Sequence, residues 1–456
     1  MPDNNELNKP EEATTPSDGA TAEPAGISRR QFLGVGAAGA VALGAAASSR
    51  SSFLKSINFR AAAAPVTITL MSWEPYGEPY EYPNWVELIS KFEIANPNIT
   101  VVWNGWPFSS FDENVIAQAQ AGSVAADVIM TPPEAASTLI QKYGIGVPLQ
   151  HIAAEEGLIP DAAHDSFRRN GNLYALGVID VAFALLYNQA RLAAAKVSPP
   201  TTPDEFLSVT EAVSKPPNVF GIALLNTVAA ASDWWNQLQN FCLPYGGVWA
   251  KGNTLTIDSP ENVKGIQFWL DLLNASGIKG TAELVIDKLF DDNRVVMNFS
   301  VAAGLSSLKK LAPAYYPQMR SVPPPWPGNK AIERLHPVIV NNKSKYIPEA
   351  MELVKYLVTP ANLYWITVQN GYPVIPYTNF GEIIPAYGQY LKTIWLKGYE
   401  ETNYVGEFQI LGNYTYAYAQ LGNIICSNLE KAVSGSATVA QALQAAQQQA
   451  SVELHL

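Results

Sequence analysis

The stretch that decides the fold runs from Val66 to Val102 and reads VTITLMSWEPYGEPYEYPNWVELISKFEIANPNITVV. It begins with apolar residues at alternate positions, Val66, Ile68 and Leu70, which is the pattern of a buried β-strand. A second β-branched run, 99–102, closes the stretch and predicts a second strand.

A helix is predicted between these two strands, because apolar residues recur there at helical spacing, at Trp85, Leu88, Ile89 and Phe92. Asn96-Pro97 ends the helix, since the residue before a proline is pushed out of the α region. Strand, helix and strand form a parallel crossover, and ligands of such sheets lie beyond the carboxyl ends of the strands. The loop after Leu70, rich in aromatic and acidic side chains, is therefore a candidate binding site.

Length and charge limit the class of protein. The chain has 456 residues, enough for two domains, and its net charge of −11 argues against nucleic acid or an anionic membrane as a partner. Two cysteines, Cys242 and Cys426, can pair in an exported protein or be plain buried thiols in their apolar runs; the second interpretation is preferred. The four histidines form no metal-binding pattern with them, so neither a metal nor a cofactor is expected.

Residues 1–64 predict an export signal rather than folded structure. The polar segment up to Gly26 is expected to be disordered. Arg29-Arg30 then precede a Gly/Ala-rich apolar run, which resembles a twin-arginine signal for export to the periplasm or the cell exterior. The alternatives are a short transmembrane anchor, or an uncleaved signal that tethers the protein to the membrane.

The rest of the chain alternates strand and helix patterns, which predicts an α/β sheet. The run from Val178 to Tyr187 is apolar apart from Asp180. Because a buried carboxylate is costly unless paired, Asp180 is predicted to mark either a strand crossing between domains or a ligand contact.

Eight segments, in this order and spacing, then carry a family resemblance: Phe92–Val101, Ala121–Ile129, Gly171–Leu176, Leu186–Gln189, Pro199–Phe206, Leu255–Val263, Asp292–Asn298 and Lys345–Ala350. Together they resemble the family-one extracellular solute-binding proteins of ABC importers, the maltose-binding-protein-like group. The resemblance implies a non-enzymatic, monomeric receptor that captures a sugar or oligosaccharide and delivers it to the transmembrane permease subunits.

The implied architecture is the type II periplasmic-binding-protein fold, with two α/β lobes joined by a hinge around a ligand cleft. By this pattern lobe 1 takes residues 65–179 and 334–378, and lobe 2 takes 180–333 and 379–456. Sugar rings need flat aromatic platforms and planar hydrogen-bonding side chains. The residues expected to bind the ligand, from the family's cleft positions and the crossings, are Trp73, Glu74, Tyr76, Asp127, Thr131, Glu134, Asp180, Trp234, Trp235, Asn298, Ser300, Tyr372, Tyr414 and Tyr416. Of the adjacent tryptophans, one is expected to face the cleft and the other the core, because neighbours on a helix point about 100° apart.

The sequence departs from the family pattern at two positions that often carry aromatic residues, where Val301–Gly304 and Thr131-Pro132 stand instead. The length of the ligand therefore stays open. A polyamine or another small solute in the same fold is the first alternative. An exported glycosidase or redox enzyme is a second, but the sequence shows no nucleophile motif or nucleotide-binding loop, and no catalytic residue is expected.

Overall fold

The computed structural model describes residues 64–76, 81–280, 289, 292–301, 308–309, 312–393 and 395–454. The chain divides into two units, 1–61 and 62–456, and all that follows concerns the second. The predicted export signal around Arg29-Arg30 lies outside the described residues.

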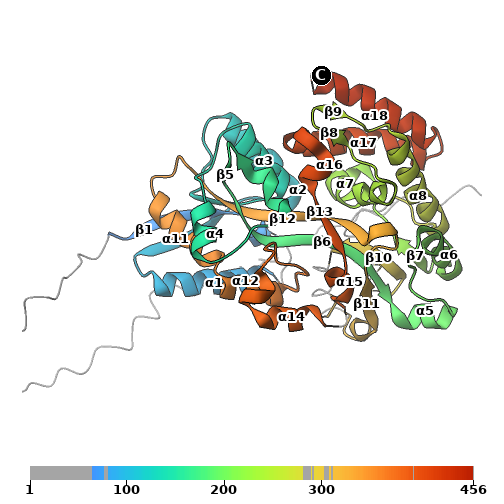
Figure 1. Cartoon of the computed structure of the whole chain (residues 1–456), viewed down its shortest axis with the longest axis horizontal. Coiled ribbons are helices and arrows are strands. Elements are labelled where there is room, and N and C mark those ends of the chain that lie inside the picture. The colour runs from blue at the N-terminus through green and yellow to red at the C-terminus, as the bar shows by residue number, and fades with distance from the viewer. Residues whose placement is uncertain are drawn as a thin grey trace, which may run out of the picture. The chain divides into compact units, whose positions relative to one another are not determined.

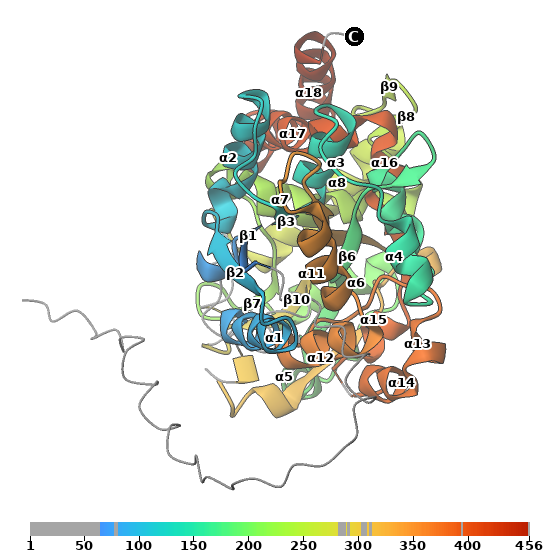
Figure 2. The ribbon, with the colours of Figure 1, turned by 90° about the vertical axis from the view of Figure 1, so that its left-hand side faces the viewer.

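The stretch that decides the fold forms the predicted unit. Strand β1 (Val66–Met71), helix α1 (Tyr82–Ala95) and strand β2 (Ile99–Asn104) follow one another, and β1 and β2 pair in parallel with Val66 opposite Ile99. The predicted apolar face of α1 is buried, and the helix ends at Asn96. Helix α12 (Pro360–Asn370) lies beside α1 (Figure 2), where Asn84 Nδ2 donates to Asn370 Oδ1 at 2.5 Å.

Nine strands form one mixed sheet within the described residues, in the order β2-β1-β3-β12-β6-β10-β7, with β11 paired to β6 and β13 to β12. The bounds of the further strands are β3 (Val128–Met130), β6 (Leu176–Asn188), β7 (Phe220–Ala223), β10 (Val295–Val301), β11 (Met319–Val322), β12 (Lys330–Val340) and β13 (Asn403–Gly406). Strands β6 and β12 are long and antiparallel, and Figure 1 shows them running side by side between the two halves of this unit. We call β6 and β12 the crossing strands.

Helices cover the sheet and follow the sequence signals for helix starts. Thr202 and Ser259 cap two of them by accepting hydrogen bonds from the backbone N–H groups of Glu205 and Asn262. The bounds of the further helices are α2 (Phe108–Gln120), α3 (Pro133–Gln141), α4 (Gln150–Glu155), α5 (Gln189–Ala195), α6 (Pro203–Val213), α7 (Ala231–Leu238), α8 (Pro260–Ser276), α11 (Ile347–Leu357), α13 (Phe380–Ile383), α14 (Pro385–Leu391), α15 (Lys397–Glu400), α16 (Glu407–Leu411), α17 (Tyr418–Val433) and α18 (Val439–Glu453).

The buried apolar side chains fall into two clusters. The first core uses residues from 68–179 and 335–387, and the second core uses residues from 182–332 and 396–450. The crossing strands pass from one core to the other, β6 between Ile179 and Ala182 and β12 between Ile332 and Leu335. The predicted lobe boundaries stay a prediction. The packing differs from them at residues 380 and 387, which were assigned to lobe 2 but pack in the first core.

Both cysteines are buried and free, so the interpretation as plain buried thiols is confirmed. Burial raises the pKa of the Cys242 and Cys426 thiols, which keeps both in the unreactive protonated form. Within the part of the chain that the structure describes, no helix combines the length and apolar character needed to cross a membrane.

Candidate functional site at the junction of the two cores

The loop after β1 begins where two chain segments pass unusually close together. Gly105, directly after β2, has a φ of +149°, and a Cβ atom at this position would lie 1.9 Å from the backbone oxygen of Ser72. Only glycine fits here, because any side chain would collide with the neighbouring backbone. This close approach positions the Trp73-Glu74 pair at the carboxyl end of β1.

Trp73 is held edge-on by three rings at the rim of the first core. Its ring centroid lies 5.5 Å from that of Phe108, 5.7 Å from Phe111 and 4.9 Å from His336, with interplanar angles of 82°, 84° and 85°. Edge-to-face contacts of this kind favour one fixed orientation of the indole. Trp73 is therefore a rigid part of the site, although only 7% of its surface is exposed in this structure.

Glu74 is a buried carboxyl group with unused hydrogen-bonding capacity. It is 2% exposed, and its Oε1 atom has no hydrogen-bond partner. Burial, and then the nearby charge of Glu81, raise the pKa of Glu74 well above its ordinary value. Tyr372 donates its hydroxyl proton to Glu81 Oε2 at 2.8 Å. A protonated Glu74 can both donate and accept a hydrogen bond.

The crossing strand β12 brings a histidine to the same edge of the sheet. It pairs antiparallel to β3 with Val338 opposite Met130, so its preceding residues extend beyond the carboxyl end of β3. His336 is buried, and neither ring nitrogen has a hydrogen-bond partner. Burial and the charge of Arg334 lower the pKa of His336 to about 3, so its ring is neutral at physiological pH. A neutral imidazole offers one donor and one acceptor.

Beside His336 lies an ion-pair network that we call the junction cluster: Asp112, Glu134, Arg334, Glu407 and Tyr418. Arg334 donates through Nε to Glu407 Oε1 at 3.2 Å and through Nη2 to Glu134 Oε2, and its guanidinium lies 4.8 Å above the centre of the Tyr418 ring. Glu134 is in the first turn of α3 and Glu407 in the first turn of α16, where helix dipoles favour negative charge. The cluster connects α3, which packs in the first core, to α16, which packs in the second.

The junction cluster carries more acidic than basic groups. Burial lowers the pKa of Arg334, but Glu134, Tyr418 and Glu407 together raise it above its ordinary value, so the guanidinium stays charged. Burial raises the pKa of Glu407 to about 7, against the opposing effect of Arg334. Burial, followed by the charge of Glu134, raises the pKa of Asp112, whose Oδ1 atom has no hydrogen-bond partner. Three carboxyl groups surround one guanidinium, an arrangement that suits neutral or cationic solutes better than anions.

A second contact joins α3 to the 3₁₀ segment η7 (Gly412–Ala417). Ser137 Oγ donates to Thr415 Oγ1 at 3.0 Å, and Thr138 Oγ1 donates to the backbone oxygen of Tyr416 at 3.0 Å. Helix α3 packs with the first core, and Tyr414 and Ala417 of η7 pack in the second. The two cores are thus in direct polar contact on this side.

The structure places the predicted Trp234-Trp235 pair inside the second core. Both indoles are 0% exposed; Trp235 contacts Trp249 and Tyr418, and Trp234 contacts Trp269. The expectation that one ring faces a cleft does not match this packing. The physical reason is that α17 and the 3₁₀ segment η4 (Gln239–Tyr245) both pack against α7, which leaves no exposed face at either indole.

Asp127 lies at the amino end of β3, opposite to the end that carries Glu134. Its Oδ2 accepts from the backbone N–H of Thr69 at 2.8 Å, and its Oδ1 accepts from the Ser344 hydroxyl. Both oxygens therefore hold the sheet and the following turn together, which corrects the expectation of a ligand contact. Thr131 is fully buried at the carboxyl end, where its hydroxyl donates to the Pro132 oxygen at 3.3 Å.

The remaining predicted residues are dispersed. Tyr76 and Tyr416 are 55% and 41% exposed, whereas Tyr414 is buried and donates its hydroxyl proton to the Asn253 oxygen at 2.7 Å. On β10, Asn298 is buried with an unpartnered Oδ1, and the backbone oxygen of Ser300 accepts from Tyr399. Asp180, in β6, forms an isolated antiparallel backbone bridge with Val374. Tyr372 donates a hydrogen bond to Glu81, as described above.

Four site residues were not singled out as ligand contacts from the sequence: Asp112, Arg334, His336 and Glu407. Strand β12 begins at Lys330, well before its apolar run Val338–Val340. The available signal was the Glu333-Arg334-Leu335-His336 run, in which polar residues occupy three of four positions next to an apolar strand. Charged residues inside a buried strand need partners, and these partners come from distant helices.

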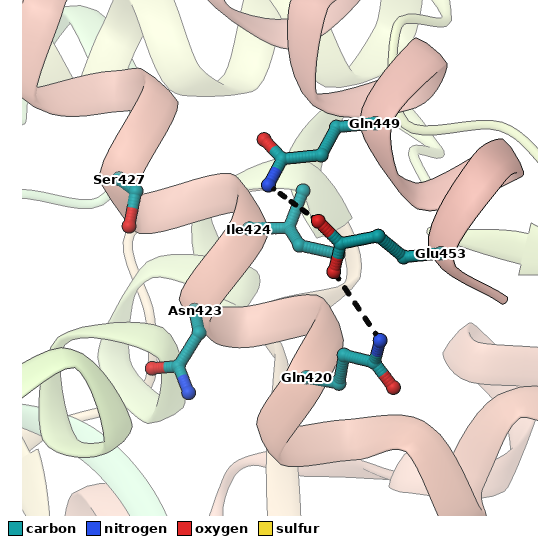
Figure 3. Close-up of a pocket in the computed structure, with 6 residues that line it drawn as sticks. All are labelled: Gln420, Asn423, Ile424, Ser427, Gln449 and Glu453. Carbon is teal, nitrogen blue, oxygen red and sulfur yellow. Dashed lines mark hydrogen bonds between the residues drawn. The ribbon is translucent and has the colours of Figure 1, made fainter.

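A shallow pocket lies elsewhere, on the exposed faces of α17 and α18 (Figure 3). It has a volume of about 360 Å³ and is lined by Gln420, Asn423, Ile424, Ser427, Gln449 and Glu453. Gln449 and Gln420 donate to the two oxygens of Glu453 at 2.8 and 3.3 Å. Because these side chains satisfy one another and include no aromatic ring, we do not assign the solute to this pocket.

The fold and the site define a class of protein: two α/β cores joined by crossing strands, with aromatic and carboxyl groups at the carboxyl ends of the strands between them. The chain belongs to the bacterial extracellular solute-binding proteins, because residues 77–363 match the model of that family. It is therefore a binding protein and not an enzyme. No curated protein matches the chain.

Solved structures share the fold at low sequence identity. A solute-binding protein of an ABC transporter from Thermotoga lettingae, bound to α-D-tagatose, has 18% identity and a TM-score of 0.72, with 84% of this chain and 98% of that chain covered. MalE3 of T. maritima, bound to maltose, has 18% identity and a TM-score of 0.69, with 86% and 100% covered. UgpB of Mycobacterium tuberculosis, in complex with glycerophosphocholine, has 16% identity and a TM-score of 0.70, with 86% and 99% covered.

Proposed function

We propose that this chain is the sugar-binding component of an ABC importer, which captures a sugar or oligosaccharide between two lobes and presents it to the permease in the membrane. Proteins of the same fold have been solved with α-D-tagatose and with maltose, which supports a carbohydrate ligand. The residues that we propose to bind this ligand include Trp73, Glu74, Asp112 and His336.

One observation carries the choice of ligand: buried hydrogen-bonding atoms are unused next to Trp73 in the chain, on the histidine that contacts its ring, and in the junction cluster. His336 contacts the indole, Glu74 follows Trp73 in the chain, and Asp112 belongs to the junction cluster beside His336. Glu74 Oε1, Asp112 Oδ1 and both His336 nitrogens are buried without hydrogen-bond partners. A sugar offers hydroxyl groups that both donate and accept, and an apolar ring face that packs on an indole.

The contacts across the junction suggest how binding is coupled to closure. Arg334 bonds Glu134 on one side and Glu407 on the other, and α3 bonds η7. A solute that touches both lobes biases a two-lobed protein toward its closed form by the difference in affinity between the two forms. We propose that the permease then distinguishes the closed form from the open one.

A polyamine is the second candidate, because the junction cluster has three carboxyl groups for one guanidinium. The same excess of carboxyl groups disfavours a solute that is recognised through a phosphate group, because a phosphate is itself negatively charged. Arg334 is the basic residue of the cluster, and it is already paired with Glu134 and Glu407.

We further propose export by the twin-arginine route, with Arg29-Arg30 as the recognised pair. Replacing both arginines by lysine is expected to retain the protein in the cytoplasm, as measured by cell fractionation. Export that is unchanged in this variant would contradict the route and leave the proposed ligand untouched.

The ligand proposal is tested by a thermal-shift screen of the protein against monosaccharides, maltose and longer oligosaccharides, spermidine and glycerophosphocholine. A specific sugar should raise the midpoint, since a ligand that binds only the folded state stabilises it by mass action. His336→Ala and Glu74→Gln should weaken the response, whereas the exposed controls His151→Ala and Glu261→Gln should keep it. No response to any sugar, with a clear response to spermidine, would replace the first candidate by the second.

A further inference from the structure

A second group of acidic side chains lies where the crossing strands pass from one core to the other. Asp161 precedes the 3₁₀ segment η2 (Ala162–Phe167), Asp180 is in β6 and Glu333 is in β12. Each contributes a carboxyl oxygen, and the three oxygens lie within 4.8 Å of one another. We call these three residues the crossing triad.

The pairing of the crossing strands separates the triad from the junction cluster. Leu335 lies opposite Asp180, and Glu333 lies opposite Ala182, so Asp180 and Glu333 share one face of the sheet. Arg334 is the next residue along β12, and its side chain points to the opposite face, toward Glu134 and Glu407. The arginine nearest in sequence therefore does not neutralise the triad.

Asp180 is the strongest sign that the triad has a ligand. It is 1% exposed, and neither Oδ1 nor Oδ2 has a hydrogen-bond partner. Glu333 is 6% exposed. Burial, and then the charges of neighbouring triad members, raise the pKa of Asp180 and raise that of Glu333 to about 8. Buried carboxyl groups of this kind are normally paired or coordinate a metal ion.

Among the residues that the structure describes, none supplies the triad with a compensating cation. Within the described residues, no lysine or arginine is paired with any of its three members. His164 donates through Nδ1 to Asp161 Oδ1 at 3.1 Å, because its Nε2 accepts from the Gly177 backbone N–H and so carries no proton. The imidazole is therefore neutral.

The other groups that face the triad are phenols. Tyr377 lies near Asp161 and donates to the Gly177 oxygen at 3.0 Å, while Tyr387 and Tyr404 lie near Asp180 and Glu333. Phenols are neutral at physiological pH and add no positive charge. They can, however, transfer excitation energy to a bound lanthanide ion, which makes the site observable.

We propose that Asp161, Asp180 and Glu333 bind a Ca²⁺ ion that ties the two crossing strands to the loop before η2. Calcium binds carboxylate oxygens at about 2.3–2.6 Å with six to eight ligands, and oxygens spaced as in the triad lie within twice that bond length. The Ala163 N–H and His164 both donate to Oδ1 of Asp161. Its second oxygen, Oδ2, is therefore available to coordinate the ion. Magnesium, with bonds of about 2.0–2.1 Å, strict octahedral geometry and a reluctance to lose its waters, suits a site built from protein carboxylates less well.

This inference is independent of the solute proposed above. The triad residues come from three separate parts of the chain, 161, 180 and 333, and no local spacing brings them together. The expectation from the sequence that no metal is bound considered only cysteine and histidine patterns, so carboxylate ligands fell outside it.

The test uses the full chain, freed of metal with EDTA and dialysed. Isothermal titration with CaCl₂ should show one ion bound per chain, and TbCl₃ should give tyrosine-sensitised luminescence that Ca²⁺ removes by competition. Calcium should raise Tm, and MgCl₂ at the same concentration should bind at least tenfold more weakly. Asp180→Asn and Glu333→Gln should each weaken Ca²⁺ binding at least tenfold, whereas the exposed control Asp258→Asn should bind like the wild type.

A folding defect is separated from a lost ligand by the metal-free proteins. In EDTA, Asp180→Asn should unfold at the same or a higher temperature than the wild type, because it removes a buried carboxyl group that is costly to ionise and whose two oxygens have no hydrogen-bond partner. The proposal is overturned if the wild type binds no Ca²⁺, if Asp180→Asn/Glu333→Gln binds as tightly as the wild type, or if Mg²⁺ binds equally well.

Discussion

The junction cluster makes a quantitative prediction about Arg334. Its side chain is 1% exposed, and its two partners, Glu134 and Glu407, are 5% exposed each. Arg334→Met keeps much of the apolar stem and removes the charge, which leaves two buried carboxyl groups without their cation. Breaking a buried, hydrogen-bonded ion pair from one side costs about 3–5 kcal/mol, and we expect a loss of unfolding free energy in this range at pH 8.

The assay is urea unfolding followed by tryptophan fluorescence and circular dichroism, with Arg334→Met compared with the wild type at several pH values. The loss should become smaller as pH falls through about 7, because Glu407, whose pKa burial raises to about 7, then takes up a proton and no longer carries buried charge. The triple variant Arg334→Met/Glu134→Gln/Glu407→Gln should recover most of the stability, since replacing a whole buried network by neutral groups is often near neutral.

The matched control is Lys397→Met, which removes a cation from an exposed ion pair with Glu401 whose side chains are 66% and 47% exposed. Exposed pairs contribute little, so this variant should unfold like the wild type. The reasoning is refuted if Arg334→Met loses less than about 1 kcal/mol at pH 8, or if the triple variant is no more stable than the single one.

Three further predictions concern separate features of the fold. Because the pKa of Glu333 is raised to about 8 from an ordinary value of 4.5, the wild type in EDTA should lose stability as pH rises from about 5 to 9, and Glu333→Gln should show a flatter profile of Tm against pH. Gly105→Ala should cost at least about 2 kcal/mol in urea unfolding, since its Cβ would meet a backbone oxygen at 1.9 Å, whereas Gly122→Ala, with an open space around its Cβ, should cost less. A thiol reagent should label neither Cys242 nor Cys426 in the native protein and both in guanidinium chloride; rapid labelling of the native protein would show that the buried positions are wrong.

Much of the fold could be predicted from local patterns. The alternation of Val66, Ile68 and Leu70, and the apolar face of the helix up to Asn96, depend only on neighbours in the chain, and the structure has both. The Thr202 cap is equally local. These features are fixed by periodicity and capping chemistry, which the sequence states directly.

The site was harder to predict because its members are far apart in the chain. Arg334 pairs with residues 200 positions before it and 73 positions after it, and neither spacing is visible as a motif. Trp73, Glu74 and Glu134 were predicted as ligand contacts because they follow strands, and ligands of such sheets lie beyond the carboxyl ends of the strands. The same rule cannot separate Trp234-Trp235 from the core, since indoles serve packing and binding equally well and only the tertiary neighbours decide.

The central claim is that a hydroxyl-rich solute binds at the junction of the two cores. It is tested most directly by a crystal structure of the protein with the sugar that gives the largest thermal shift. We predict density for the sugar against the Trp73 ring, with its hydroxyl groups hydrogen-bonded to Glu74, Asp112 or His336. A sugar bound instead in the pocket between α17 and α18, with the Trp73 environment unchanged, would contradict the claim.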